Sequence, residues 1–136
     1  MKKTCFVLVL CVLFNFVATI NAQAEENYVE PRYNNISNIE YTFTINNDNA
    51  TAVVFWQGYN GTISHVDVSV CIEKKGLLGM WWTDVESWST TSYNSYDELV
   101  FNTTVGNGTY RCRFEVTVYS NVNSSDVITD EITVKN

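Results

Sequence analysis

Apolar and polar residues alternate one by one through most of the chain after residue 38, and this pattern constrains the fold more than any other feature of the sequence. In the segment 109–120 the even-numbered residues from Tyr110 to Val118 are apolar, and most odd-numbered ones are polar. A period of two residues places one set of side chains on each face of a β-strand. Turn-forming Asn, Gly and Ser residues separate seven such segments: 39–46, 50–58, 64–74, 81–88, 97–104, 109–120 and 126–134.

Seven strands within residues 39–136 predict an all-β fold, namely a seven-stranded antiparallel β-sandwich of the immunoglobulin or fibronectin-III type. No window after residue 24 carries an apolar stripe at helical spacing, so we expect no substantial helix. Tyr110 follows the turn 106–108 and precedes Cys112 by two residues. This is the position of a tyrosine corner in such sandwiches.

The N-terminal segment predicts export. Lys2 and Lys3 precede the apolar run 5–20, and Ala22-Gln23-Ala24 has the small-x-small pattern that a signal peptidase recognises. A membrane anchor is the alternative, but the run is shorter than the roughly 20 residues that a spanning helix needs. We therefore expect residues 1–24 to be a signal peptide, residues 25–38 to be a flexible polar lead-in, and the protein to be secreted and extracellular.

Charge narrows the choice of partner. Removal of residues 1–24 lowers the Lys and Arg count from eight to six against fifteen Asp and Glu, so the net charge changes from −7 to −9. So acidic a chain repels phosphate backbones and anionic headgroups. We expect no nucleic-acid partner and no membrane partner after cleavage, and an unknown extracellular protein or glycan as the ligand.

Two cysteines, Cys71 and Cys112, remain after cleavage. In an oxidising compartment two cysteines can form one disulfide bridge. The alternation places Cys71 on the polar side of its strand and Cys112 on the apolar side of another, which disfavours a bridge between them.

Catalytic and metal-binding patterns are weak. His65 is the only histidine, and no local motif surrounds it, so we predict no catalytic residue and no enzyme. The acidic groups at 97–98, 126 and 130–131 lack the spacing of a calcium loop. We expect no metal site and no cofactor.

The aromatic residues supply the candidate site. Positions 82, 84, 86 and 88 share one parity on the strand 81–88, which predicts one outward row of Trp82, Asp84, Glu86 and Trp88. Flat aromatic rings can stack on sugar rings, so this row is the candidate ligand-binding site. The alternative is that these tryptophans pack on neighbouring loops at the edge of a sheet.

Six Asn-x-Ser/Thr sequons occur, at Asn35, Asn49, Asn60, Asn102, Asn107 and Asn123. In a eukaryotic secretory pathway they would be glycosylation sites, whereas in a bacterium an Asn-rich composition produces such tripeptides by chance.

Several short motifs are shared with a known family. Lys74-Lys75, then a Trp at 81 or 82 with Val85 and Trp88, then Gly108-Thr109-Tyr110-Arg111 resemble small secreted single-domain immunoglobulin-like sandwich proteins of Firmicutes, a domain-of-unknown-function family. The resemblance covers roughly residues 36–135. It implies the sandwich fold and a bacterial origin, and it supplies no catalytic residue.

We expect a secreted, non-catalytic binding or interaction module. One alternative is a carbohydrate-binding module that uses exposed Trp and Tyr residues. A second is a small secreted inhibitor or effector that uses the loop 76–79.

Overall fold

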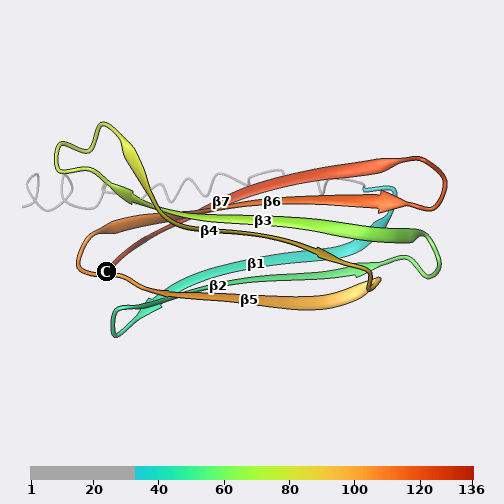
Figure 1. Ribbon diagram of the computed structural model, residues 1–136, viewed down its shortest axis with the longest axis horizontal. Helices are drawn as coiled ribbons and strands as arrows, with labels where there is room; N and C mark the ends of the chain where they lie inside the picture. The colour runs from blue at the N-terminus through green and yellow to red at the C-terminus, as the bar shows by residue number, and fades with distance from the viewer. Residues whose placement is uncertain (1–32) are drawn as a thin grey trace, which may run out of the picture. The chain divides into compact units, whose positions relative to one another are not determined.

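The computed structural model describes residues 33–136, and this part of the chain forms seven antiparallel β-strands and no helix (Figure 1). Their bounds are β1 Ile36–Asn46, β2 Asn49–Gly58, β3 Ile63–Lys75, β4 Trp82–Ser92, β5 Tyr96–Thr104, β6 Thr109–Ser120 and β7 Ser125–Lys135. Every predicted strand is present. No helix long and apolar enough to cross a membrane occurs within residues 33–136.

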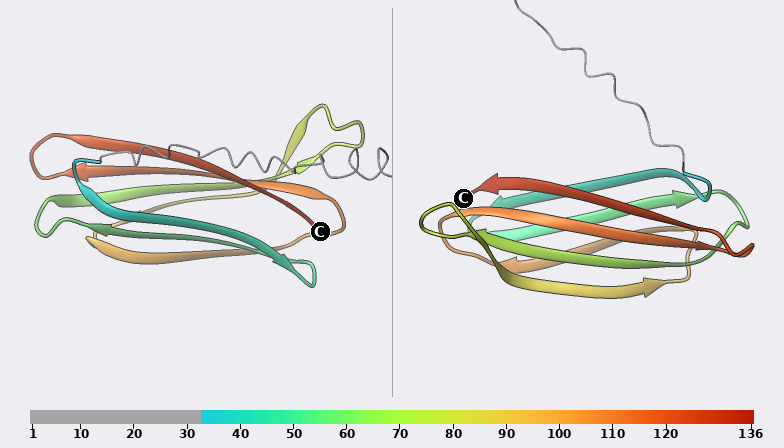
Figure 2. Two further views of the ribbon diagram at one scale, coloured as in Figure 1. Left: turned by 180° about the vertical axis from the view of Figure 1, so that it is seen from behind. Right: turned by 90° about the horizontal axis from the view of Figure 1, so that it is seen from above.

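The strands form two sheets that face each other (Figure 2). One sheet has the order β1-β2-β5 and the other has the order β4-β3-β6-β7. This confirms the predicted all-β sandwich. The turns that connect the strands lie at two opposite ends of the sandwich. The β1–β2, β3–β4 and β5–β6 turns lie at one end, and the β2–β3, β4–β5 and β6–β7 turns lie at the other.

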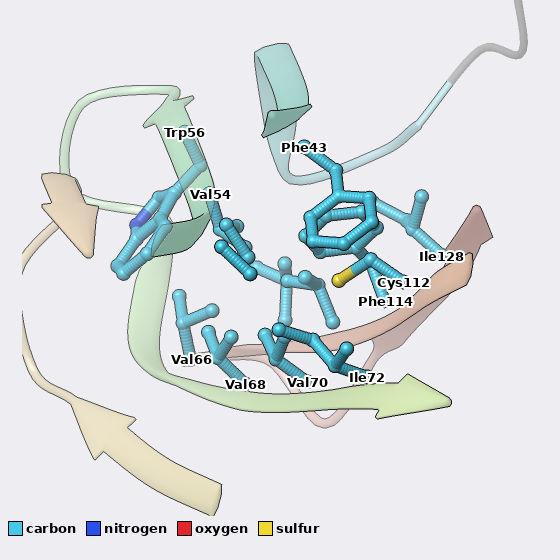
Figure 3. Packing of buried hydrophobic residues seen from close by; sticks show 14 of the residues in the cluster. Phe43, Val54, Trp56, Val66, Val68, Val70, Ile72, Cys112, Phe114 and Ile128 are labelled. Atoms are coloured by element: carbon cyan, nitrogen blue, oxygen red, sulfur yellow. The ribbon is translucent and has the colours of Figure 1, made fainter. Parts of the chain in front are cut away.

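The core lies between the sheets and follows the predicted alternation (Figure 3). Side chains that the alternation directs inward on β2, β3 and β6 are fully or almost fully buried: Ala52, Val54, Trp56, Val66, Val68, Val70, Ile72, Tyr110, Cys112, Phe114, Val116 and Val118. Trp56 is the largest of them, and its indole Nε1 donates a hydrogen bond to the Asn94 carbonyl at 3.2 Å. All of these contacts are made within residues 33–136, so this part of the chain has a hydrophobic core of its own.

Two predicted boundaries are wrong. β1 begins at Ile36, so residues 36–38 belong to the sandwich and not to a flexible lead-in. The Ile36 side chain is buried, and the neighbouring Asn35 holds Asp126 through its backbone N–H at 2.9 Å and its Nδ2 at 3.1 Å. β4 continues to Ser92, because its polar residues pair with β3. The predicted signal peptide 1–24 lies outside the described residues.

The surroundings of Asn35 decide whether the sequon at this residue can carry a glycan in the folded protein. Asn35 is only 4% exposed, and its side-chain nitrogen contacts both Asp126 and Ser124. A glycan attached to that nitrogen has no space in the folded protein. The other five sequon asparagines are exposed.

The two cysteines face opposite sides of one sheet. Cys71 pairs with Arg113 on the outer face, whereas Cys112 pairs with Ile72 and is buried between the sheets. Both thiols are free. Burial, with a smaller contribution from the nearby Cys71, raises the pKa of Cys112 to about 12. The Cys112 thiol is therefore uncharged at neutral pH and packs as an apolar residue.

Tyr110 forms the predicted tyrosine corner. Its hydroxyl donates a hydrogen bond to the Gly106 carbonyl at 2.8 Å, four residues upstream. This bond holds the β5–β6 turn against the start of β6.

Tyr41 has a buried hydroxyl whose removal should not lower the stability of the fold. Its ring packs on Phe114 at 5.0 Å between centroids, and its hydroxyl is buried without a hydrogen-bond partner among the described residues. Burial raises the pKa of this hydroxyl, and the nearby Tyr33 and Asp130 raise it further. Because an unsatisfied buried hydroxyl is costly, we expect Tyr41→Phe to raise the free energy of unfolding by about 1 kcal/mol in urea denaturation. A comparable loss of stability would contradict this expectation.

Candidate functional site

The predicted row of tryptophans and acids does not lie on one face of the sheet. The pairing of β3 with β4 shifts at Val85, since Ile72 pairs with Glu86 while the next residue, Glu73, pairs with Asp84. Val85 is thus the extra residue of a β-bulge, and it reverses which face the following side chains occupy. Alternation alone could not reveal this bulge, because 82–88 reads equally well as an unbroken strand.

The bulge sends the two halves of the row to opposite faces. Trp82 and Asp84 stand on the outer face, opposite Lys75 and Glu73. Trp88 stands on the inner face opposite the buried Val70, where it is half-buried and its ring centroid lies 5.4 Å from that of Phe101. Trp88 therefore packs against the core between the sheets, and Trp82 is the tryptophan of this row on the outer face.

Trp82 is flanked by cations. The Arg111 guanidinium carbon lies 4.6 Å from the centroid of the Trp82 ring, and Lys75 Nζ lies 5.8 Å from it. These distances are those of cation–π contacts. They occupy part of the ring surface that a sugar would otherwise use, which weakens the case for Trp82 as a stacking platform.

Glu73 is the centre of an ion-pair cluster on the outer face. Its Oε2 accepts hydrogen bonds from Arg111 Nε and from Arg113 Nε, the latter at 2.9 Å. The Glu73 side chain is only 7% exposed. The hydrogen bond from Arg111, with the charges of both arginines, outweighs burial and holds the pKa of Glu73 below its usual value. Glu131 joins the cluster at 3.4 Å from Arg111 Nη1.

A shallow depression of about 850 Å³ lies on the outer face of the four-stranded sheet. Its floor contains Cys71 and Arg113, which are cross-strand partners, and Ser87 Oγ donates to Cys71 Sγ at 3.3 Å. The remaining outward side chains around it are hydroxyls and carboxylates, namely Ser69, Ser89, Thr129, Glu115, Asp84 and Glu131. Val70, Trp88 and Phe114, which lie at inward positions of their strands, complete the lining. The depression can therefore accept and donate many hydrogen bonds.

The β3–β4 loop, residues 76–81, is the most unusual surface feature of the described residues. Leu77 is 104% exposed, Leu78 is 70% exposed, Met80 is 72% exposed and Trp81 is 49% exposed. The loop has a defined backbone, because Gly79 N donates to the Gly76 carbonyl and Gly76 N donates to the Trp81 carbonyl, each at 2.9 Å. The two leucines therefore occupy the corners of a hydrogen-bonded turn.

Two glycines make that turn possible. Gly79 has a φ of +68°, a value that residues with a Cβ rarely adopt. At Gly76 a Cβ would collide with the indole ring of Trp81, which lies against the backbone there. The loop backbone therefore has a defined conformation that holds the apolar side chains in exposed positions.

His65 lies in β3, on the outer face of the four-stranded sheet. Its imidazole stacks on the Tyr119 ring at 4.3 Å between centroids with an interplanar angle of 12°, and Tyr93 lies 6.1 Å away. The ring nitrogen Nδ1 contacts Ser64 Oγ at 3.2 Å. These contacts describe an aromatic cluster on the outer face.

The acidic groups are separated by the fold. Asp97 lies at the start of β5, where Ser92, Asn94 and the Glu98 N–H donate to it. Burial raises its pKa, but these hydrogen bonds together bring it below the usual value. Asp126 lies in the other sheet, against Asn35. Within residues 33–136 no group of three or more His, Cys, Asp and Glu side chains is placed to hold a metal ion.

Two features of this surface escaped sequence reasoning. The Glu73–Arg111–Arg113 cluster could be predicted only from the pairing of β3 with β6, which the sequence does not give. All three residues do fall on the polar sides of their strands. The high exposure of Leu77 and Leu78 was also not predicted, because leucine is among the residue types most often buried. Comparison of the chain with protein-family models, with curated proteins and with solved structures finds no match.

Proposed function

We propose that this protein is a secreted, non-catalytic binding module with a fibronectin-III-like sandwich, and that it binds through the end carrying the β3–β4 loop. The strand order supports the finer fold assignment. β4 pairs with β3 in the four-stranded sheet, whereas in a constant-type immunoglobulin domain the fourth strand pairs with the fifth. The basic and apolar N-terminus supports export.

One observation carries the binding proposal, namely the four large apolar side chains at the tip of the β3–β4 loop. Apolar groups of this size are normally buried, and their contiguous exposure marks interaction sites on soluble proteins. The hydrogen bonds of the turn hold them in place before any ligand arrives, which reduces the entropy lost on binding.

The test is a binding panel read by co-sedimentation. It compares wild type, Leu77→Ser/Leu78→Ser and Val122→Ser on insoluble polysaccharides, peptidoglycan, phospholipid vesicles and intact cells with or without protease treatment. Val122 is a matched control, because it is 81% exposed in the β6–β7 turn at the other end of the sandwich. We expect saturable binding to one target by wild type and Val122→Ser, and at least about tenfold weaker binding by the double variant. Equal binding by all three proteins would contradict the proposal.

The depression on the outer face favours a second candidate, a glycan-binding surface. Its hydroxyls and carboxylates are suited to hydrogen bonding with sugar hydroxyls, and Trp82 stands on the same face. Ser69→Trp would fill the depression without altering the loop. Loss of polysaccharide retention in Ser69→Trp, with retention unchanged in Leu77→Ser/Leu78→Ser, would select this candidate over the first.

A further inference from the structure

We propose that the β3–β4 loop docks on a phospholipid bilayer that contains anionic lipids, with Leu77, Leu78 and Met80 entering the interface. This inference rests on the proposed function, because it assigns a partner to the same loop. It differs from the expectation drawn from the overall charge, since the two lysines next to the tip form no ion pair within residues 33–136.

The shape of the loop fits a bilayer. Figures 1 and 2 show the β3–β4 hairpin extending beyond the neighbouring turns at its end of the sandwich. Leu77 and Leu78 occupy the corners of its hydrogen-bonded turn, and Met80 and Trp81 follow immediately. Such a tip can enter the acyl boundary while Trp81, a residue type enriched at membrane interfaces, remains at headgroup depth.

The charges around the tip fit anionic headgroups. Residues 74–83 contain Lys74 and Lys75 and no carboxylate. The five cations of the described residues, Lys74, Lys75, Arg111, Arg113 and Lys135, all lie on the halves of β3, β6 and β7 nearest to the loop. The carboxylates on the same half of the sheet, Glu73, Asp84, Glu86 and Glu131, lie behind the tip and outside residues 74–83. The two arginines are paired with Glu73, whereas the three lysines form no ion pair within residues 33–136.

The lysines are therefore available to phosphate groups. Lys74 Nζ lies 5.4 Å from the Tyr110 ring and Lys75 Nζ lies 5.8 Å from the Trp82 ring, and neither contact neutralises a charge. Unpaired lysines next to an inserted apolar tip are the combination by which peripheral proteins bind anionic membranes.

A bilayer fits this tip better than a protein surface does. A stable protein interface buries about 800 Å² on each partner and needs shape complementarity. A tip of four side chains is small for that purpose, whereas a fluid lipid surface accepts a convex apolar tip of any shape. A second copy of this chain would have to provide an apolar cleft, and the depression on the outer face is lined mainly by hydroxyls and charges.

The experiment uses the chain from Glu25 onward, which retains every residue of the described sandwich, with vesicles of phosphatidylcholine alone or mixed with phosphatidylglycerol. Binding is measured by co-sedimentation, and insertion is measured by the blue shift of tryptophan emission and its quenching by brominated lipid. Trp81→Phe removes the reporter at the tip. The loss of the shift in this variant therefore assigns the signal to Trp81.

We expect binding to the mixed vesicles with a blue shift that Trp81→Phe abolishes. Leu77→Ser/Leu78→Ser should weaken binding at least about tenfold on hydrophobic grounds, and the control Val122→Ser should bind like wild type. Lys75→Gln should weaken binding to the mixed vesicles about fivefold, with a smaller effect on neutral vesicles and at high salt.

Four outcomes would overturn the bilayer proposal. Vesicle binding that survives the double serine change would show that the tip does not insert. Absence of vesicle binding, with loop-dependent binding to a glycan or to protease-sensitive sites on cells, would leave the proposed function intact and assign another partner. Concentration-dependent dimers that the double serine change dissociates would identify a second copy as the occupant. Absence of any loop-dependent binding would overturn the proposed function as well.

Discussion

Replacing Trp56 with alanine is expected to lower the free energy of unfolding by about 3–5 kcal/mol, the largest effect of any change discussed. Trp56 is fully buried at the end of the core next to the β4–β5 turn, and the change would leave a cavity and remove the hydrogen bond to the Asn94 carbonyl. A domain of this size has a total stability of about 5–15 kcal/mol. Thermal denaturation followed by near-UV circular dichroism should show a fall in Tm of roughly 12 °C or more.

Trp81→Ala is the matched control for this prediction. It removes the same side chain from the exposed tip of the β3–β4 loop, where 49% of the residue already contacts solvent. We expect a change of about 0.5 kcal/mol or less, because the removed ring contacts mainly the backbone of Gly76 and solvent. Equal losses in the two variants would contradict the assignment of Trp56 to the core and of Trp81 to the surface.

Glu73→Gln is expected to lower the free energy of unfolding at pH 7 by about 1–2 kcal/mol. The carboxylate is 7% exposed and accepts hydrogen bonds from both Arg111 and Arg113, and the neutral amide loses the charge that strengthens them. Glu131→Gln is the control, since that carboxylate is 53% exposed and lies 3.4 Å from Arg111. Its loss should be below about 0.5 kcal/mol, because exposed ion pairs contribute little.

The pH dependence of the difference in stability between wild type and Glu73→Gln tests whether the charge of Glu73 causes it. The folded state lowers the pKa of Glu73 from its usual value near 4.5, chiefly through the hydrogen bond from Arg111. The stability that Glu73 contributes is therefore complete above that usual value and is lost as the pH falls through the lowered pKa of the folded state. Urea denaturation of both proteins across this acid range should show the difference between wild type and Glu73→Gln shrinking toward zero. A difference that is independent of pH would attribute the loss to packing instead.

The candidate site was predicted only in part, and the reason lies in one residue. The alternation of β4 was correct for Trp82 and Asp84, but the bulge at Val85 placed Glu86 and Trp88 on the other face. A bulge is fixed by how two strands pair, and this one lies opposite Ile72 and Glu73 of β3. Local sequence carries no comparable signal, because Val is an ordinary strand residue.

The exposure of the β3–β4 loop also could not be predicted from the sequence. The glycines at 76 and 79 predict a turn, and the sequence shows two leucines between them. Whether these leucines fold back onto the core depends on what surrounds the hairpin. Because the hairpin extends past the neighbouring turns, no described part of the sandwich covers Leu77 (Figure 1).

The sequence by itself determined the seven strands, the inward face of every strand except β4, and the separation of the two cysteines. These properties follow from the period-two alternation, which is a local consequence of strand geometry. The tertiary structure alone decided the order of strands in the two sheets, the bulge in β4, the grouping of the lysines and arginines at one end, and the exposure of the β3–β4 loop. Each of these depends on contacts between residues far apart in the chain, such as Glu73 with Arg111, and such contacts form only when the sheets assemble.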